Sequence, residues 1–85
     1  KKWGKNRIIR ELKMREISKF NIDAALSEID DNKYHEVFDS LSRKRLAQIK
    51  NEPNKYKKRK KLADYLLYRG WPGDWVYEKT KELIP

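Results

Sequence analysis

The chain has 85 residues, of which 38% are hydrophobic and 41% are charged, and its formal net charge is +9. A chain of this length forms one small domain or part of one and buries about 60–65% of the surface that its unfolded form exposes. The composition favours solvated helices that each bury a narrow apolar stripe, and it disfavours an enzyme. Cysteine is absent, which excludes disulfides and thiolate metal sites.

Helical spacing of apolar residues predicts three helices in the first half of the chain. The first is expected over residues 5–16. The second is expected over residues 19–29, directly after Ser18, whose hydroxyl suits the N-cap position. The third and longest helix is expected to begin near Asp31, where acidic side chains favour a helix N-terminus.

Proline and glycine mark the ends of two further helices. Pro53 disfavours helix at the residue before it, so residues 51–54 are predicted to form a turn. A fourth helix is expected over residues 55–69, closed by Gly70. The last helix is expected over residues 74–83, with Asp74 as its cap. The chain is therefore predicted to be all-α, with five helices.

An internal repeat relates the first pair of helices to the last pair. A shift of 54 residues superimposes mainly the apolar positions that are expected to face inward, and it places an arginine before each turn. This register predicts that Leu12 and Leu66 are equivalent and that both are buried. The coinciding pairs are Ile8 with Leu62, Leu12 with Leu66, Arg15 with Arg69, Ile17 with Trp71, Ile22 with Val76, Glu28 with Glu82, and Ile29 with Leu83.

The repeated element resembles one that is found in the RecX family of RecA regulators. That element reads Leu-x-x-[Lys/Arg]-Gly-[Ile/Phe], and residues 66–71 match it as Leu-Leu-Tyr-Arg-Gly-Trp. Residues 12–18 match it with one departure, because Glu16 stands where glycine is usual. Residues 2–8 are similar to the Trp-Gly-Lys segment that opens the middle repeat of many members, and residues 24–45 resemble the passage into the last repeat.

This resemblance implies tandem three-helix repeats. Residues 1–30 would supply the last two helices of one repeat, and residues 31–85 would form a complete repeat. The chain opens without methionine, so it is expected to be a piece of a longer protein. The resemblance implies that a complete member has a further repeat upstream.

The resemblance also implies a function. RecX proteins lodge in the groove of the RecA–DNA filament, inhibit ATP hydrolysis and strand exchange, and limit filament growth, in the setting of recombination, DNA repair and the SOS response. Such a protein needs no cofactor and catalyses no reaction of its own. A cytoplasmic monomer with RecA and DNA as partners is expected, and a membrane span is not.

Charge is distributed in blocks that suit an anionic partner. Residues 1–19 hold eight basic and two acidic side chains, and residues 42–61 hold ten basic and one acidic. Residues 20–41 reverse this balance, with one basic and six acidic side chains. A protein–DNA filament offers both signs of charge, whereas naked DNA has no use for six acids.

The candidate partner-binding residues are cations of these blocks and one tryptophan. The densest run consists of Lys55, Lys57, Lys58, Arg59, Lys60 and Lys61; weaker candidates are Arg7, Arg10, Lys13, Arg43, Lys44, Arg45 and Trp3. Cations at a helix start oppose the macrodipole, which favours a functional reason for the run, although a solvated helix start is the simpler alternative. The weaker cations could instead form exposed ion pairs worth under about 1 kcal/mol, and Trp3 could instead belong to the core.

Two further residues and two alternative functions remain to be considered. His35 has no neighbouring histidine or cysteine, so it is expected at the surface and not as a metal ligand. Trp71 is expected in the core because it coincides with Ile17 in the repeat. The main alternative function is a stand-alone helical DNA- or RNA-binding domain, since basic helices look alike in sequence. A purely structural interaction fragment is the third reading.

Overall fold

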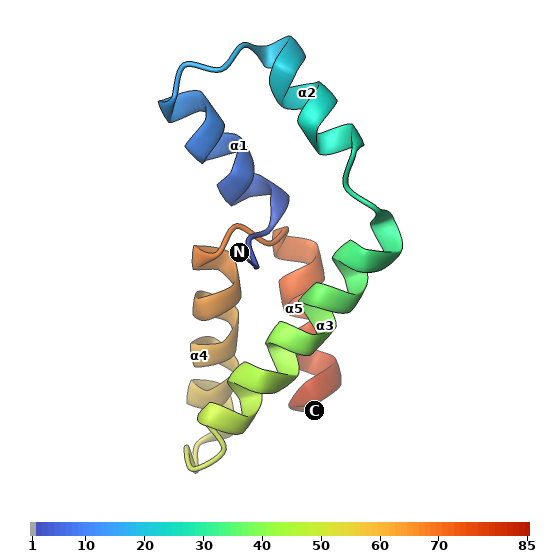
Figure 1. The fold of residues 1–85 in the computed structure, drawn as a ribbon. Helices are drawn as coiled ribbons and strands as arrows, with labels where there is room; N and C mark the ends of the chain where they lie inside the picture. The colour runs from blue at the N-terminus through green and yellow to red at the C-terminus, as the bar shows by residue number, and fades with distance from the viewer. Residues whose placement is uncertain (1) are drawn as a thin grey trace.

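The computed structural model describes residues 2–85 and contains five helices and no strand within that range. They are α1 (Lys5–Met14), α2 (Lys19–Ser27), α3 (Asp31–Gln48), α4 (Lys55–Tyr68) and α5 (Gly73–Leu83). The molecule is elongated, with extents of 45 × 25 × 20 Å. Figure 1 shows α3, α4 and α5 together at one end, while α1 and α2 form an arm at the other. The predicted all-α fold is confirmed.

Three of the helices, α2, α3 and α4, begin where a short polar side chain accepts from the first free amides. The Ser18 hydroxyl accepts from the Asn21 amide at 3.3 Å, as predicted. The Asp30 carboxylate accepts from the amides of Asn32 and Lys33, and Asn54 caps α4 in the same way. The prediction for Asp74 is wrong: α5 begins at Gly73 after Pro72, and Asp74 lies in the first turn of the helix. A proline that precedes the helix fixes the backbone there without a side-chain cap.

The two interhelix turns related by the repeat share their hydrogen bonds. The Ile17 amide donates to the Leu12 carbonyl at 3.1 Å, and the Trp71 amide donates to the Leu66 carbonyl at 3.2 Å. Both turns have a residue with positive φ at the same place, Glu16 at 60° and Gly70 at 89°. The local geometry therefore follows the 54-residue register through the turn.

Glu16 occupies a conformation that favours glycine, because a Cβ in the left-handed region costs about 1–2 kcal/mol. Its side chain makes no ion pair with any residue that the structure describes. We therefore expect Glu16→Gly to raise the free energy of unfolding by about 0.5–1 kcal/mol, after the greater freedom of glycine in the unfolded chain is subtracted. Urea melts of the two proteins measure this change, and Lys13→Gly, inside α1, is the control that should instead be destabilising.

The core lies almost wholly in the bundle of α3, α4 and α5. Leu62, Leu66 and Val76 are 0% exposed and Trp71 is 1% exposed, so the core position predicted for Trp71 is confirmed. The arm differs, because α1 has no fully buried side chain and Leu12 is only half-buried. The prediction that both leucines are buried holds for Leu66 and is wrong for Leu12. In the bundle, α3 packs against both α4 and α5, whereas α1 and α2 pack chiefly on each other.

Candidate partner-binding surface

The residues of the basic run at the start of α4 have different contacts. The Arg59 guanidinium donates through Nε to the Ile84 carbonyl at 2.7 Å and so holds the end of α5. Lys60 pairs with Asp64 at 3.0 Å, and Lys61 pairs with Glu52 at 2.8 Å. Lys55 and Lys57 are exposed and Lys58 is half-buried; none of the three forms an ion pair within the described chain. The structure therefore does not present the run as one uniform basic face.

Arg43 belongs to a charge network between α3 and α5. It lies 3.0 Å from the Asp39 carboxylate and 3.5 Å from that of Glu82, and Lys79 contacts both carboxylates at 3.0 and 3.4 Å. The Arg43 hydrogen bond, helped by Lys79, holds the pKa of Asp39 below its usual value. This network joins α3 to α5, and its two carboxylates already neutralise the charge of Arg43 locally. The neighbouring Lys44 is exposed and forms no ion pair among the described residues.

Arg45 takes part in a stack that spans two helices. Its guanidinium lies 4.8 Å from the centroid of the Tyr65 ring, and the guanidinium of Arg69 lies 4.9 Å from the same centroid. Arg45 also donates to the Gln48 side chain at 3.2 Å, while its buried Nε has no hydrogen-bond partner. Two cations thus share one tyrosine ring at the junction of α3 and α4.

A second stack joins the arm to the bundle. The Arg7 guanidinium lies 4.9 Å from the centroid of the Trp3 ring and 5.3 Å from that of Tyr68. Its Nε also pairs with Glu11 at 3.2 Å, and its Nη1 donates to the Tyr68 carbonyl at 3.4 Å. Farther along α1, Arg10 lines a shallow hollow together with Asn6, Ile9, Lys13 and Met14.

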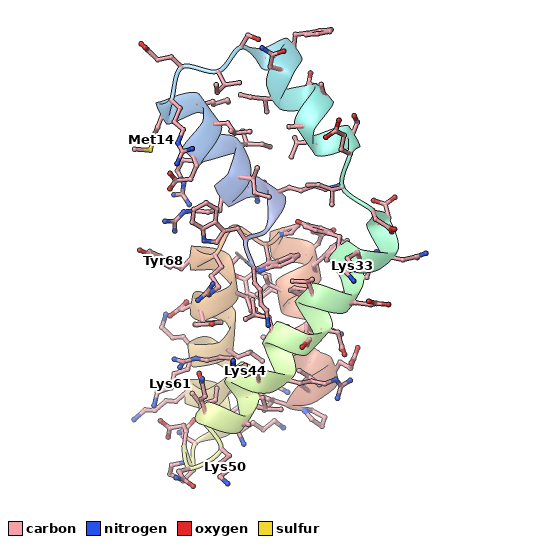
Figure 2. The ribbon with its side chains drawn as sticks, viewed as in Figure 1. Met14, Lys33, Lys44, Lys50, Lys61 and Tyr68 are labelled. Carbon is pink, nitrogen blue, oxygen red and sulfur yellow. The ribbon has the colours of Figure 1, made fainter. Side chains whose placement is uncertain are left out.

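These side chains, linked in part by the stacks of Arg7 and Arg45 across α1, α3 and α4, make up a surface that we call the basic edge. Figure 2 shows Met14, Tyr68 and Lys61 along the same side of the molecule, where α1 and α4 lie end to end. The structure brings predicted residues from three helices together here. It adds Tyr65, Tyr68 and Arg69, which were not among the partner-binding residues predicted from the sequence. The basic edge consists of Arg7, Arg10, Lys13, Arg45, Lys61, Tyr65, Tyr68 and Arg69.

The composition of the basic edge suits nucleic acid. Arginine and lysine neutralise phosphates, and exposed aromatic rings stack on bases. Tyr68 is 73% exposed, so its ring is accessible although Arg7 lies over one part of it. The positions of Tyr65 and Arg69, four residues apart on one side of α4, are the signal that could have identified them in the sequence.

A groove on another face, between α3 and α5, has different chemistry. It has a volume of about 290 Å³ and is lined by His35, Phe38, Asp39, Trp75, Glu78, Lys79 and Glu82. His35 is exposed, as predicted, and its ring stacks on that of Trp75 at 4.2 Å. Across residues 2–85, no group of three or more potential metal ligands is assembled, and no helix is long and apolar enough to cross a membrane.

Comparison with known families identifies the bundle. Residues 33–79 match the model of the third three-helix domain of RecX. The chain belongs to the RecX family. The matched RecX segment runs from α3 into α5, so it holds the core of the bundle together with Arg45, Tyr65, Tyr68 and Arg69 of the basic edge.

A curated relative extends the similarity over nearly the whole chain. The regulatory protein RecX of Clostridioides difficile (strain 630) is 32% identical over 83 residues, which are 98% of this chain and 39% of the relative. The chain thus spans about two fifths of that RecX protein. No solved structure gave a match. RecX is a family of regulatory proteins, and the helical-repeat architecture agrees with that membership.

Proposed function

We propose that this chain is part of a RecX-type modulator that binds the RecA–DNA filament and inhibits its ATP hydrolysis, strand exchange and growth. Membership of the RecX family is the observation that carries the proposal. The basic edge supports it, because cations and aromatic rings of α1, α3 and α4 form one surface that suits the DNA of a filament. In this proposal the chain acts in the cytoplasm as a monomer, without a cofactor.

The distribution of acidic side chains supports a filament over naked DNA as the target. Asp23, Glu28, Asp31 and Glu36 are exposed and pair with no cation in the described part of the chain. They belong to α2 and the first half of α3, which Figure 1 shows on the side opposite α1 and α4. A filament that presents phosphates beside basic protein groups would attract both the basic edge and these acidic side chains. DNA alone would attract only the basic edge.

The test compares three targets at one salt concentration: RecA filaments on single-stranded DNA, naked single-stranded DNA, and free RecA. We expect the tightest binding to the filament, together with slower ATP hydrolysis by RecA when the chain is added. Repulsion of the acidic side by naked DNA is weakened beyond about 8–10 Å by ordinary buffer, so the measurement is best made at low salt.

The competing function is a stand-alone helical domain that binds DNA or RNA directly. The basic edge favours it to the extent that stacking and phosphate contacts need no protein partner. Equal affinity for naked DNA and for the filament, with unchanged RecA ATP hydrolysis, would support this alternative and contradict regulation of RecA.

A further inference from the structure

The arm and the bundle meet through backbone atoms at the turn between α4 and α5. The Gly4 amide donates to the Arg69 carbonyl at 2.8 Å, and the Asn6 amide donates to the Gly70 carbonyl at 3.0 Å. The Lys5 amide donates to the Tyr34 hydroxyl of α3 at 2.8 Å. Figure 1 shows the start of the chain lying against this turn. Three successive residues at the N-terminal end of α1 are thus bound to the bundle.

These contacts satisfy groups that each helix leaves without a partner. The first amides of a helix and its last carbonyls have no partner within the helix. No side chain caps the start of α1, because Gly4 stands at the N-cap. The carbonyls that follow α4 supply the acceptors, and the negative end of α4 lies beside the positive end of α1, which is a favourable arrangement of their dipoles.

Both glycines are required by the closeness of this contact. A Cβ on Gly4 would overlap the Gly70 carbonyl and the Trp71 amide nitrogen, and a Cβ on Gly70 would overlap the backbone of Arg7. The φ angle of Gly4 is −74°, which suits any residue, so its side chain is excluded by the neighbouring backbone and not by its own conformation. Because the obstructing atoms belong to the backbone, they cannot move aside as a flexible side chain would.

The contact also joins the two parts of the basic edge. Arg7 lies in the first turn of α1, and from there it reaches the Tyr68 carbonyl and the Tyr68 ring on α4. If α1 moved away from the turn, Arg7 and Arg10 would move with it. The Arg45–Tyr65–Arg69 stack would stay on the bundle, because all three of its members belong to it.

We propose that Gly4 and Gly70 form a backbone clamp that fixes the arm on the bundle in the orientation that makes the basic edge continuous. They act as positioning residues, and Tyr34 supports them through the Lys5 amide. The part of this inference that concerns partner binding rests on the proposed function. The part that concerns the clamp itself does not.

The decisive variant is Gly4→Ala, and its matched control is Gly73→Ala. A Cβ on Gly73 would come no nearer to another residue than 4.0 Å, from the Tyr77 ring, so the control adds the same methyl group without a clash. In Gly4→Ala we expect the amides of residues 4, 5 and 6 to exchange with solvent at least about tenfold faster, because their bonded state opens more often. The control should exchange at the parental rate.

Residual dipolar couplings then report the angle between the two parts. In Gly4→Ala, the couplings of α3, α4 and α5 should still fit one orientation, while those of α1 and α2 no longer fit the same one. A second variant, Tyr34→Phe, keeps the ring in the core and removes only the acceptor for the Lys5 amide, so it should shift exchange in the same direction. Unchanged exchange and couplings in both variants would overturn the clamp.

Binding to RecA filaments on single-stranded DNA tests the positioning role. If the docked arrangement falls to about a tenth of its population, the affinity of Gly4→Ala should fall about tenfold, since only that fraction is competent to bind. Faster exchange with parental filament affinity would refute the positioning role. If the parent itself does not bind filaments, the proposed function fails, while exchange and couplings still decide the clamp because they involve no RecA.

Discussion

Replacing Leu66 with alanine is expected to lower the free energy of unfolding by about 2–5 kcal/mol, the range for truncation of a fully buried leucine. Leu66 is 0% exposed and belongs to the same core cluster as Leu62, Trp71 and Val76, with side chains of α3 on the other side. The core of so small a domain cannot readily collapse around the resulting cavity. Urea melts followed by circular dichroism measure the change, with the parent protein alongside.

Leu12→Ala is the matched control, because the repeat places Leu12 at the equivalent position of α1. Leu12 is half-buried, so less apolar surface returns to water and little cavity forms. A loss of about 1–2 kcal/mol is expected, smaller than that of Leu66→Ala. Equal losses for the two variants would show that the arm has a core as complete as that of the bundle, contrary to the structure.

The helices themselves were predictable because their signals are local. Apolar spacing predicts all five, Ser18 and Gly70 mark boundaries through their own chemistry, and the repeat carries the register through both turns. The difference in burial between Leu12 and Leu66 was not predictable. A periodic pattern indicates which side of a helix faces inward, but it does not say what covers that side, and only the second pair is covered by α3.

The sequence was enough to predict that the candidate surface is basic, but not to predict which residues belong to it. Arg59 is held by the carbonyl of Ile84, Lys61 by Glu52, and Arg43 by Glu82 as well as Asp39. Except for Asp39, these partners lie at least nine residues away in the sequence, so helical spacing could not reveal them. Tyr65 is an intermediate case, because its spacing to Arg69 is visible in the sequence whereas its second stacking cation, Arg45, comes from α3.

The end-to-end placement of α1 and α4 follows from two glycines far apart in the chain. Gly70 is recognisable from sequence as a helix terminator, but its contact with Gly4 is a tertiary feature. The basic edge therefore depends on a contact between the arm and the bundle, whereas the helices of each part are marked by local sequence signals. This dependence makes the affinity for a partner sensitive to changes at either glycine, even where no partner contact is lost.

Neutralising three cations of the basic edge should weaken filament binding more than any change of the same charge elsewhere. In the triple variant Arg10→Gln, Lys13→Gln and Arg69→Gln, the helices keep their caps and core, and none of the three side chains forms an ion pair within the described residues. Because the variant makes fewer phosphate contacts, its binding releases fewer counterions from the DNA. The slope of log affinity against log salt should fall by about two, and the affinity at low salt by about tenfold or more.

The control for this variant removes the same charge from outside the basic edge, with Lys19→Gln, Lys33→Gln and Lys81→Gln. Figure 2 places Lys33 on α3 away from the side that holds Met14, Tyr68 and Lys61. Both triple variants lower the net charge by three, so a general loss of attraction to DNA would affect them equally. A local surface predicts that the control keeps nearly the parental slope, because the slope depends on the number of phosphates that the protein contacts. Titrations against RecA filaments at two salt concentrations measure both slopes, and matching losses in the two variants would reduce the basic edge to an ordinary solvated face.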